Sequence, residues 1–294
     1  LIAHMSALFM AAISVSEKEL HNRIYQYAKK GGRDILFVSV GGTSSINDYL
    51  CLVSQKWKLN LKVILENWDN VSSKAVFNFI PSRIGVWGKQ AEVFANKIHG
   101  IPIDKIDLVG NPRVEWLKDN FNGSASKNHI LFAGGSEKFE EEMEYLFTLA
   151  KLVANEPIRT EVKYLPHPKR YSLAKIKLTL LKQMGIVILN EEMIRSEDTD
   201  ESDLQLPILE IYKECFDGAY LVVSPLSTMN LEAGILGIPT IGLNSIAQNI
   251  SGKRKIYVSR VHDHLIELET KGMMRIVESA KELENLLVPL LGDA

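Results

Sequence analysis

The chain has 294 residues, of which 46% are hydrophobic and 24% are charged, and its formal net charge is -2. This composition is ordinary for a soluble globular protein and allows one large domain or two ordinary domains with a sizeable core. The near-neutral charge gives no global basic field, so we do not expect nucleic acid as a partner. No uncharged apolar run reaches the roughly 18 residues that a membrane helix needs.

Two further features concern the cellular compartment. Cys51 and Cys215 lie far apart in apolar surroundings, which favours buried thiols in a reducing compartment over a disulfide framework. The apolar first twenty residues lack a basic n-region and are a poor signal peptide. They start without Met and contain a His-Met pair, so we expect a chain trimmed at its N-terminus. We expect a cytoplasmic location and leave open a place at the inner face of the membrane.

Apolar β-rich runs alternate with helical patterns, which is typical of βαβ units and parallel sheets. In the first part of the chain the sequence predicts strands at 34–40, 61–66, 83–88 and 105–112. It predicts helices at 45–60 and 89–99, the second closed by Gly100. The stretch FNGSASKNH (121–129) is small, polar and rich in Gly and Ser, so it is the best candidate for a linker.

After this linker the alternation restarts. The sequence predicts strands at 129–135, 161–168, 186–190, 219–225 and 238–243, and helices at 137–154, 172–185, 206–218, 227–237 and 279–291. We therefore predict an α/β fold of two Rossmann-like lobes, residues 1–122 and 123–294. We interpret the acidic segment 137–144 and the acidic loop 195–203 as solvated surface. The loop lacks EF-hand spacing, so we assign no metal.

Ligands of open parallel sheets bind beyond the carboxyl ends of the strands. In the second lobe three predicted strands are followed by unusual residues. Gly134 and Gly135 would let a ligand approach the backbone, although a tight turn explains them equally well. His167 could donate to a phosphate or act as an acid, and Lys169 and Arg170 would add positive charge. A structural role for a histidine between two prolines stays open.

The stretch SPLSTMNLEAGILG holds the third cluster, which begins at Ser224. Ser227 and Thr228 fall at the start of a predicted helix, where free N–H groups and the helix dipole attract anions such as phosphate. Glu232 lies at i+4 from Thr228 on the same face, where its carboxylate could accept from ribose hydroxyls. The alternative is that the two hydroxyls only cap the helix and Glu232 favours its dipole.

In the first lobe the candidates lie in GGTSS, which contains Gly42, and in ENWDNVSSK. Asp69 follows a predicted strand between Trp68 and Asn70, where partial burial would suit a general base. An Asx turn beside a buried Trp is the alternative. Arg113, after an Asn-Pro pair, would shape the cleft wall or only follow the end of a strand.

Taken together, the order AGG, LPHPKR and VVSPLSTMNLEAGILGIPTIGL resembles the nucleotide-binding lobe of GT-B glycosyltransferases. The closest similarity is to bacterial surface-polysaccharide transferases, including CDP-glycerol glycerophosphotransferase and sialyltransferase-like groups. The first-lobe stretch, with WDN-x-SSK, VWG, HGIP and GNPR, is similar to uncharacterised members of that broad group. The resemblance covers roughly residues 34–245. The short first lobe departs from it, because a complete lobe usually starts with further βα units.

The resemblance implies a metal-independent transferase that moves a sugar or polyol phosphate from a nucleotide-activated donor to a glycan or lipid-linked surface acceptor. It implies no cofactor. Donor phosphates would meet Ser227, Thr228 and His167, with Ser224, Lys169 and Arg170 beside them. Glu232 would hold the ribose, and Gly134 and Gly135 would line the donor site. By its position, and not by the resemblance, Asp69 is the expected base, and His167 is the second expected catalytic residue. We expect Gly42, Trp68, Asn70 and Arg113 on the acceptor side.

Two alternatives stay open. A UDP-sugar 2-epimerase-like enzyme shares this fold and a phosphate site at a helix start. It would be expected to present several acidic residues to the sugar, and among the carboxylates only Asp69 stands out. The other alternative is a nucleotide-binding lobe without turnover.

Overall fold

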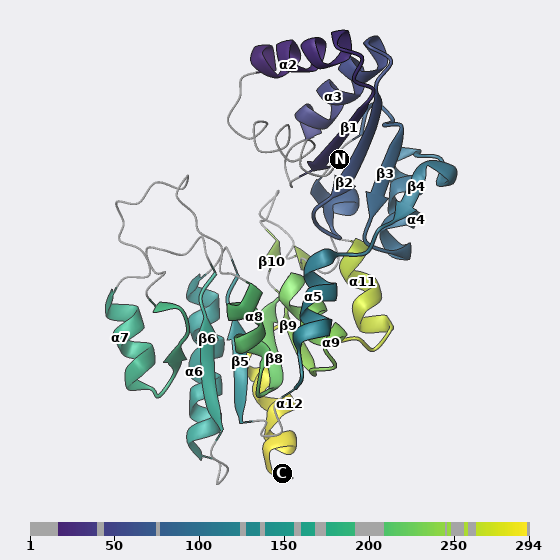
Figure 1. The fold of residues 1–294 in the computed structure, drawn as a ribbon. Coiled ribbons are helices and arrows are strands. Elements are labelled where there is room, and N and C mark those ends of the chain that lie inside the picture. The colour runs from purple at the N-terminus through teal and green to yellow at the C-terminus, as the bar shows by residue number, and fades with distance from the viewer. Residues whose placement is uncertain are drawn as a thin grey trace. The chain divides into compact units, whose positions relative to one another are not determined.

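The computed structural model describes residues 17–39, 44–74, 77–123, 128–135, 139–155, 160–167, 175–191, 209–244, 246–247, 256–257 and 263–292. The chain divides into two compact units, Leu1–Pro112 (unit 1) and Arg113–Ala294 (unit 2). Each unit is built on a parallel sheet with helices packed against it (Figure 1). The predicted α/β fold class is confirmed.

Unit 1 contains a sheet whose strands pair in the order in which they occur along the chain, β1-β2-β3-β4, all parallel. The strands are β1 (Asp34–Ser39), β2 (Asn60–Leu65), β3 (Arg83–Val86) and β4 (Ile106–Leu108). The other elements are α2 (Glu17–Lys29), α3 (Ser44–Lys56), the π-helical turn η1 (Asn70–Lys74), α4 (Lys89–His99) and the 3-10 turn η2 (Ile103–Lys105). Each predicted strand of this part is therefore present, with β4 much shorter than expected.

Helix α4 ends at Gly100, as the sequence predicts. Gly100 adopts the left-handed conformation with a φ of 65°, which favours glycine, and its N–H donates to the carbonyl of Asn96 at 3.0 Å. The next N–H, that of Ile101, reaches back to the carbonyl of Ala95 at 3.2 Å. The chain then turns, and the fully buried Ile101 joins the core of unit 1.

Unit 2 contains a larger parallel sheet with the strand order β12-β9-β8-β5-β6-β7. The strands are β5 (His129–Ala133), β6 (Glu161–Leu165), β7 (Val187–Ile188), β8 (Ala219–Pro225), β9 (Thr240–Leu243) and β12 (Arg275–Val277). The helices are α5 (Pro112–Asn120), α6 (Phe139–Asn155), α7 (Lys175–Gln183), α8 (Leu209–Phe216), α9 (Thr228–Ile235), α11 (Asp263–Thr270) and α12 (Ala280–Gly292). A small antiparallel pair joins β10 (Ile246–Ala247) to β11 (Ile256–Tyr257).

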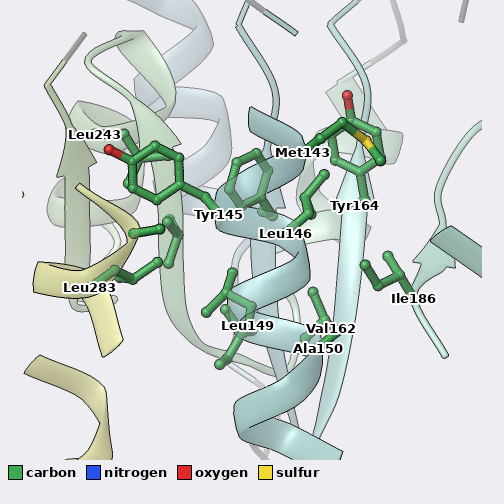
Figure 2. Packing of buried hydrophobic residues seen from close by; sticks show 14 of the residues in the cluster. Met143, Tyr145, Leu146, Leu149, Ala150, Val162, Tyr164, Ile186, Leu243 and Leu283 are labelled. Carbon is green, nitrogen blue, oxygen red and sulfur yellow. The ribbon is translucent and has the colours of Figure 1, made fainter. Parts of the chain in front are cut away.

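The core of unit 2 lies on both faces of this sheet. Figure 2 shows one face, where Leu146 and Leu149 of α6 belong to one buried cluster. The cluster also contains Val162 of β6, Leu283 of α12 and Ile186, which comes directly before β7. A second cluster joins α5, α8 and α9 to residues of β5, β6 and β8. All five residues of β5 are buried, as expected for a parallel strand covered on both faces.

The division between the units falls at the start of α5, after Pro112, and not at the Gly/Ser-rich stretch. We expected a boundary at residue 122, but α5 packs on unit 2, where Leu117 is almost fully buried beside Leu131 of β5 and Phe216 of α8. Pro112 occupies the first helical position, where its missing N–H costs nothing. The Asn-Pro pair that we interpreted as the end of a strand is therefore the start of a helix.

The thiols of Cys51 and Cys215 are both buried, as expected, and burial raises the pKa of each to about 12. Among the helices that the structure describes, none is long and apolar enough to span a bilayer.

Candidate functional site

Three of the sequence-predicted clusters follow strands that are neighbours in the sheet. In unit 2, β5 lies between β6 and β8, and all three run parallel. Their carboxyl ends carry Gly134-Gly135, Pro166-His167 and the turn after β8 respectively. The chain leaves β5 toward β6 on one side and later returns to β8 on the other. Ligands of open α/β sheets bind at such switch points, so this edge is the candidate site.

The Gly-Gly turn fits closely between the neighbouring strand ends. The N–H of Gly134 donates to the carbonyl of Leu165 in β6 at 2.9 Å. A Cβ atom on Gly134 would lie 3.1 Å from the hydroxyl of Tyr164, and one on Gly135 would lie 3.1 Å from Pro225 Cγ. Both positions are therefore tight for any larger residue because of protein neighbours, and an approach by a ligand stays a prediction.

Glu142 supports this turn from α6. Its Oε1 accepts from the N–H of Gly135 at 2.8 Å, and its Oε2 accepts from the hydroxyl of Tyr164 at 3.5 Å. The side chain is buried, so our interpretation of segment 137–144 as solvated surface was wrong at this residue. The helical period places Glu142 on the same face as the core residues Leu146 and Leu149, and this pattern is the signal that could have identified it.

The start of α9 is ordered by a reciprocal capping box. Ser227 is the N-cap, with extended backbone, and its N–H donates to Oδ1 of Asn230 at 3.1 Å. The Ser227 side chain accepts from the backbone N–H of Asn230. The hydroxyls of Ser224 and Ser227 lie 2.9 Å apart, and Ser224 is fully buried. The capping interpretation of Ser227 is therefore confirmed, and phosphate binding stays a prediction for the partly exposed Ser227 and Thr228.

Asn230 is the residue at this helix start that sequence reasoning missed. It is 1% exposed, and its Nδ2 donates to Thr240 Oγ1 at 2.9 Å and to the carbonyl of Ile241 at 3.2 Å. One amide thus ties the first turn of α9 to the neighbouring strand β9. The serine at the N-cap with asparagine three residues later is the local signal for it.

Glu232 pairs with Arg113 of α5, 119 positions earlier in the chain. Arg113 Nε donates to Oε1 at 2.6 Å and Nη2 donates to Oε2 at 3.1 Å, a forked geometry. The guanidinium carbon also lies 3.9 Å from the ring centroid of Tyr212 in α8. The Glu232 side chain is 0% exposed, whereas that of Arg113 is 32% exposed.

These contacts change two expectations. Arg113 belongs to unit 2 and contacts residues of that unit, because α5 packs there; we expected it on the acceptor side of the first lobe. The Glu232 carboxylate is bound to Arg113 and its side chain is 0% exposed, so the predicted ribose contact would require Glu232 to become accessible, and it stays a prediction. Burial raises the pKa of Glu232, an effect that Arg113 opposes.

In unit 1 the predicted base follows β2 as expected. The Asp69 side chain is half-buried, and its backbone carbonyl accepts from the N–H groups of Ser72 and Ser73 at 3.1 and 3.0 Å, which starts η1. The neighbouring Trp68 and Asn70 are buried, with exposed fractions of 6% and 0%. They therefore offer little surface to an acceptor in this structure, and their acceptor-side role stays a prediction. The buried Trp of the alternative interpretation is present, and the turn beside it is held by the backbone carbonyl of Asp69.

Some predicted residues lie outside the described part of the chain. These are Gly42, Lys169, Arg170 and the acidic loop 195–203. Within the described residues, no three His, Cys, Asp or Glu side chains are placed to hold a metal ion. Metal independence stays a prediction.

Comparison with known proteins gives a fold but no family. No protein-family model matches the chain. Among curated proteins, 91 residues are 32% identical to the transcription elongation factor GreA of Clostridium novyi, which is 30% of this chain and 56% of that protein. The chain thus spans little more than half the length of that relative, too little to place it in a family.

Several solved structures have a similar fold over nearly the whole length of this chain. The UDP-GlcNAc 2-epimerase of Neisseria meningitidis, bound to UDP-GlcNAc, is similar with a TM-score of 0.58 at 12% identity, over 94% of this chain and 74% of that one. The enzyme of Methanocaldococcus jannaschii, in complex with UDP-GlcNAc and UDP, gives 0.53 at 14% identity, over 96% and 76%. At these identities the likeness concerns the fold alone, and the chain has the GT-B fold with two Rossmann-like lobes.

Proposed function

We propose that the chain is a transferase that binds a nucleotide-activated donor in unit 2 and moves its sugar, or polyol phosphate, to a surface glycan acceptor. The observation that carries this proposal is the meeting of three clusters at one sheet edge. Gly134-Gly135, His167 and Ser227-Thr228 follow the adjacent strands β5, β6 and β8. Such an edge is where α/β folds bind nucleotides.

The start of α9 supplies the proposed phosphate site. The first N–H groups of a helix have no intrahelical carbonyl to donate to, and the dipole favours an anion. Thr228 is partly exposed there and can add a hydroxyl. His167, partly exposed two residues after β6, is proposed to donate to the phosphate or to the leaving group. Asn230 and Glu142 hold the two turns, because both are buried and bonded to backbone N–H groups.

The proposed reaction breaks the bond between the donor's transferred group and its phosphate, and the acceptor hydroxyl forms the new bond. Asp69 is the proposed base that takes the proton of that hydroxyl. The leaving group is the nucleoside diphosphate when a sugar is transferred and the nucleoside monophosphate when a polyol phosphate is transferred. Its developing charge would be stabilised by the helix start and by cationic side chains, without a metal.

A second candidate is a UDP-sugar 2-epimerase-like activity. The similarity of the fold to two such enzymes, over 94% and 96% of the chain, favours it. Both candidates require a nucleotide bound to unit 2, and they differ in the fate of the sugar. An epimerase needs no acceptor, whereas a transferase leaves the sugar unchanged until an acceptor is supplied.

Calorimetric titration with UDP, CDP, CMP and GDP tests the shared part of the proposal. We expect one nucleotide to bind the wild type. Thr228→Ala should lower the affinity for that nucleotide by about tenfold, because a hydrogen bond to a charged group is lost. The matched control is Thr179→Ala, an exposed threonine of α7, with unchanged affinity. If no nucleotide binds the wild type, the assignment of unit 2 fails.

Product analysis then separates the two candidates. The chain is incubated with nucleotide sugars that carry the base it prefers, with and without an oligosaccharide acceptor. A product that contains the acceptor supports transfer. An epimeric sugar formed without the acceptor supports the second candidate and excludes the first.

A further inference from the structure

We propose that Arg113 is a further nucleotide-binding residue, whose guanidinium, oriented by Glu232 and Tyr212, donates to the diphosphate of the donor. This inference rests on the proposed function, in which unit 2 binds a nucleoside diphosphate. Arg113, Glu232 and Tyr212 all belong to unit 2, on α5, α9 and α8.

Exposure identifies Arg113 as the member of the pair that a ligand can reach. The Glu232 side chain is 0% exposed and Tyr212 is 8% exposed, whereas 32% of the Arg113 side chain is accessible. A ligand that meets this cluster therefore meets a cation first. An anionic ligand, and not a neutral hydroxyl, is the partner that a guanidinium prefers.

The position of the pair along α9 agrees with a phosphate ligand. Glu232 lies four residues after Thr228, so the two share a face and are separated by about 6 Å along the helix axis. Helical side chains lean toward the N-terminus, which brings the carboxylate and its bound guanidinium toward the first turn. The proposed phosphate site at this first turn is thus within reach of the long Arg113 side chain.

The guanidinium is also fixed in orientation before any ligand arrives. The fork to Glu232, at 2.6 and 3.1 Å, sets its plane, and the Tyr212 ring lies 3.9 Å from its central carbon. The two bonds to Glu232 hold Nε and Nη2 on a buried carboxylate. A preorganised donor loses little side-chain entropy on binding.

The competing explanation is that the pair only anchors α5 to unit 2. Both explanations predict damage when Arg113 alone is removed, because Glu232 would be left buried without its cation. They differ in one measurable property. A contact with phosphate affects the binding of a nucleoside diphosphate and leaves that of the parent nucleoside unchanged, whereas structural damage weakens both.

The test compares these two ligands by calorimetry, using whichever of UDP, CDP and GDP binds the wild type best, and its nucleoside. The main variant replaces both members, Arg113→Met with Glu232→Met, since an apolar replacement of a buried pair often preserves folding. We expect the diphosphate to bind about tenfold or more weakly and the nucleoside to change less than about twofold. Circular dichroism checks folding.

Two single variants complete the design. Glu232→Gln keeps the guanidinium and should bind the diphosphate within about threefold of the wild type, because a neutral acceptor still orients Arg113. Arg113→Lys keeps a cation beside Glu232 but loses the fork, and it should weaken the diphosphate severalfold and leave the nucleoside unchanged. If the double variant does not fold, Arg113→Lys distinguishes a phosphate contact from a purely structural role. The matched control is Arg83→Met with Asp107→Asn, an exposed pair of unit 1.

The outcomes are distinct. Equal weakening of both ligands, or unchanged diphosphate affinity in the double variant, would overturn the role of Arg113 and leave the proposed function intact. A loss of diphosphate affinity in Glu232→Gln as large as in the double variant would trace the loss to Glu232 although the guanidinium is still present, and it would also overturn the inference. A wild type that binds none of UDP, CDP, CMP and GDP would overturn the proposed function and this inference with it, whereas a wild type that binds CMP alone would overturn only this inference.

Discussion

The N–H of Gly135 donates to Oε1 of Glu142 at 2.8 Å, so a buried carboxylate of α6 holds the turn that follows the central strand β5. Turn and carboxylate are seven residues apart, and the bond fixes the path of the chain where it leaves the sheet. The position of Gly135 against Pro225 of β8 depends on this path.

Glu142→Ala should destabilise unit 2 by about 2–3 kcal/mol, because it leaves the Gly135 N–H without this acceptor and opens a small cavity. Glu142→Gln, which keeps an acceptor oxygen, should cost about 1 kcal/mol. Urea unfolding measures both. Glu141→Gln, one residue earlier and exposed, is the control and should change little. A cost for Glu142→Ala no larger than for Glu141→Gln would show that the bond contributes nothing.

Asn230→Ala should cost about 2–3 kcal/mol, since it removes the amide that caps Ser227 and bonds to Thr240 and Ile241 of unit 2. The same variant should weaken nucleotide binding in the proposed site, because the start of α9 loses its order. Asn120→Ala, at the exposed end of α5, is the matched control. Unfolding in urea and calorimetric titration are the measurements, and unchanged stability would contradict the capping role.

Gly100→Ala should destabilise unit 1 by about 1 kcal/mol, although a Cβ there would meet no atom within 4 Å. The cost comes from the positive φ of 65° alone. Gly88→Ala provides the comparison, because its Cβ also enters open space but its φ of -171° is extended backbone. Equal costs for the two variants in thermal or urea unfolding would exclude backbone strain as the cause.

Stability should fall as the pH drops below about 6.5, the usual pKa of histidine, because of His129. This imidazole is fully buried, and burial lowers its pKa. The folded protein therefore binds fewer protons than the unfolded chain between the lowered pKa and 6.5. His129→Gln should lose this part of the pH dependence. Urea midpoints measured from about pH 8 to pH 5 test it, and a slope that persists in the variant would assign it to other groups.

Much of this fold follows from local patterns. The apolar run that became β5 predicts a strand buried on both faces, and Gly100 predicts the end of α4, because both signals depend on neighbouring residues only. The start of α5 was missed although its signal was local as well. Pro112 followed by the apolar Val114 and Leu117 is typical of a first helical turn, but an Asn-Pro pair is equally typical of the end of a strand.

The candidate site shows where single-sequence reasoning ends. The rule that ligands bind beyond strand ends selected Gly134, His167 and Thr228, and the sheet places their strands side by side. The partner of Glu232 could not be predicted. Nothing in the sequence indicates which cation will lie beside a given carboxylate 119 positions away, because that choice depends on how α5 packs.

The order of strands in the two sheets has a consequence for synthesis on the ribosome. In unit 1 each strand pairs with the next one along the chain, so its sheet can grow as the chain emerges. In unit 2 the first strand to emerge is β5, which lies in the middle of the sheet. One edge of β5 stays unpaired until β8 has been made, because Ile130 of β5 pairs with Leu221 of β8. An apolar strand with an open edge is prone to aggregate. Unit 2 is therefore the part of the nascent chain that most needs protection until β8 has been made.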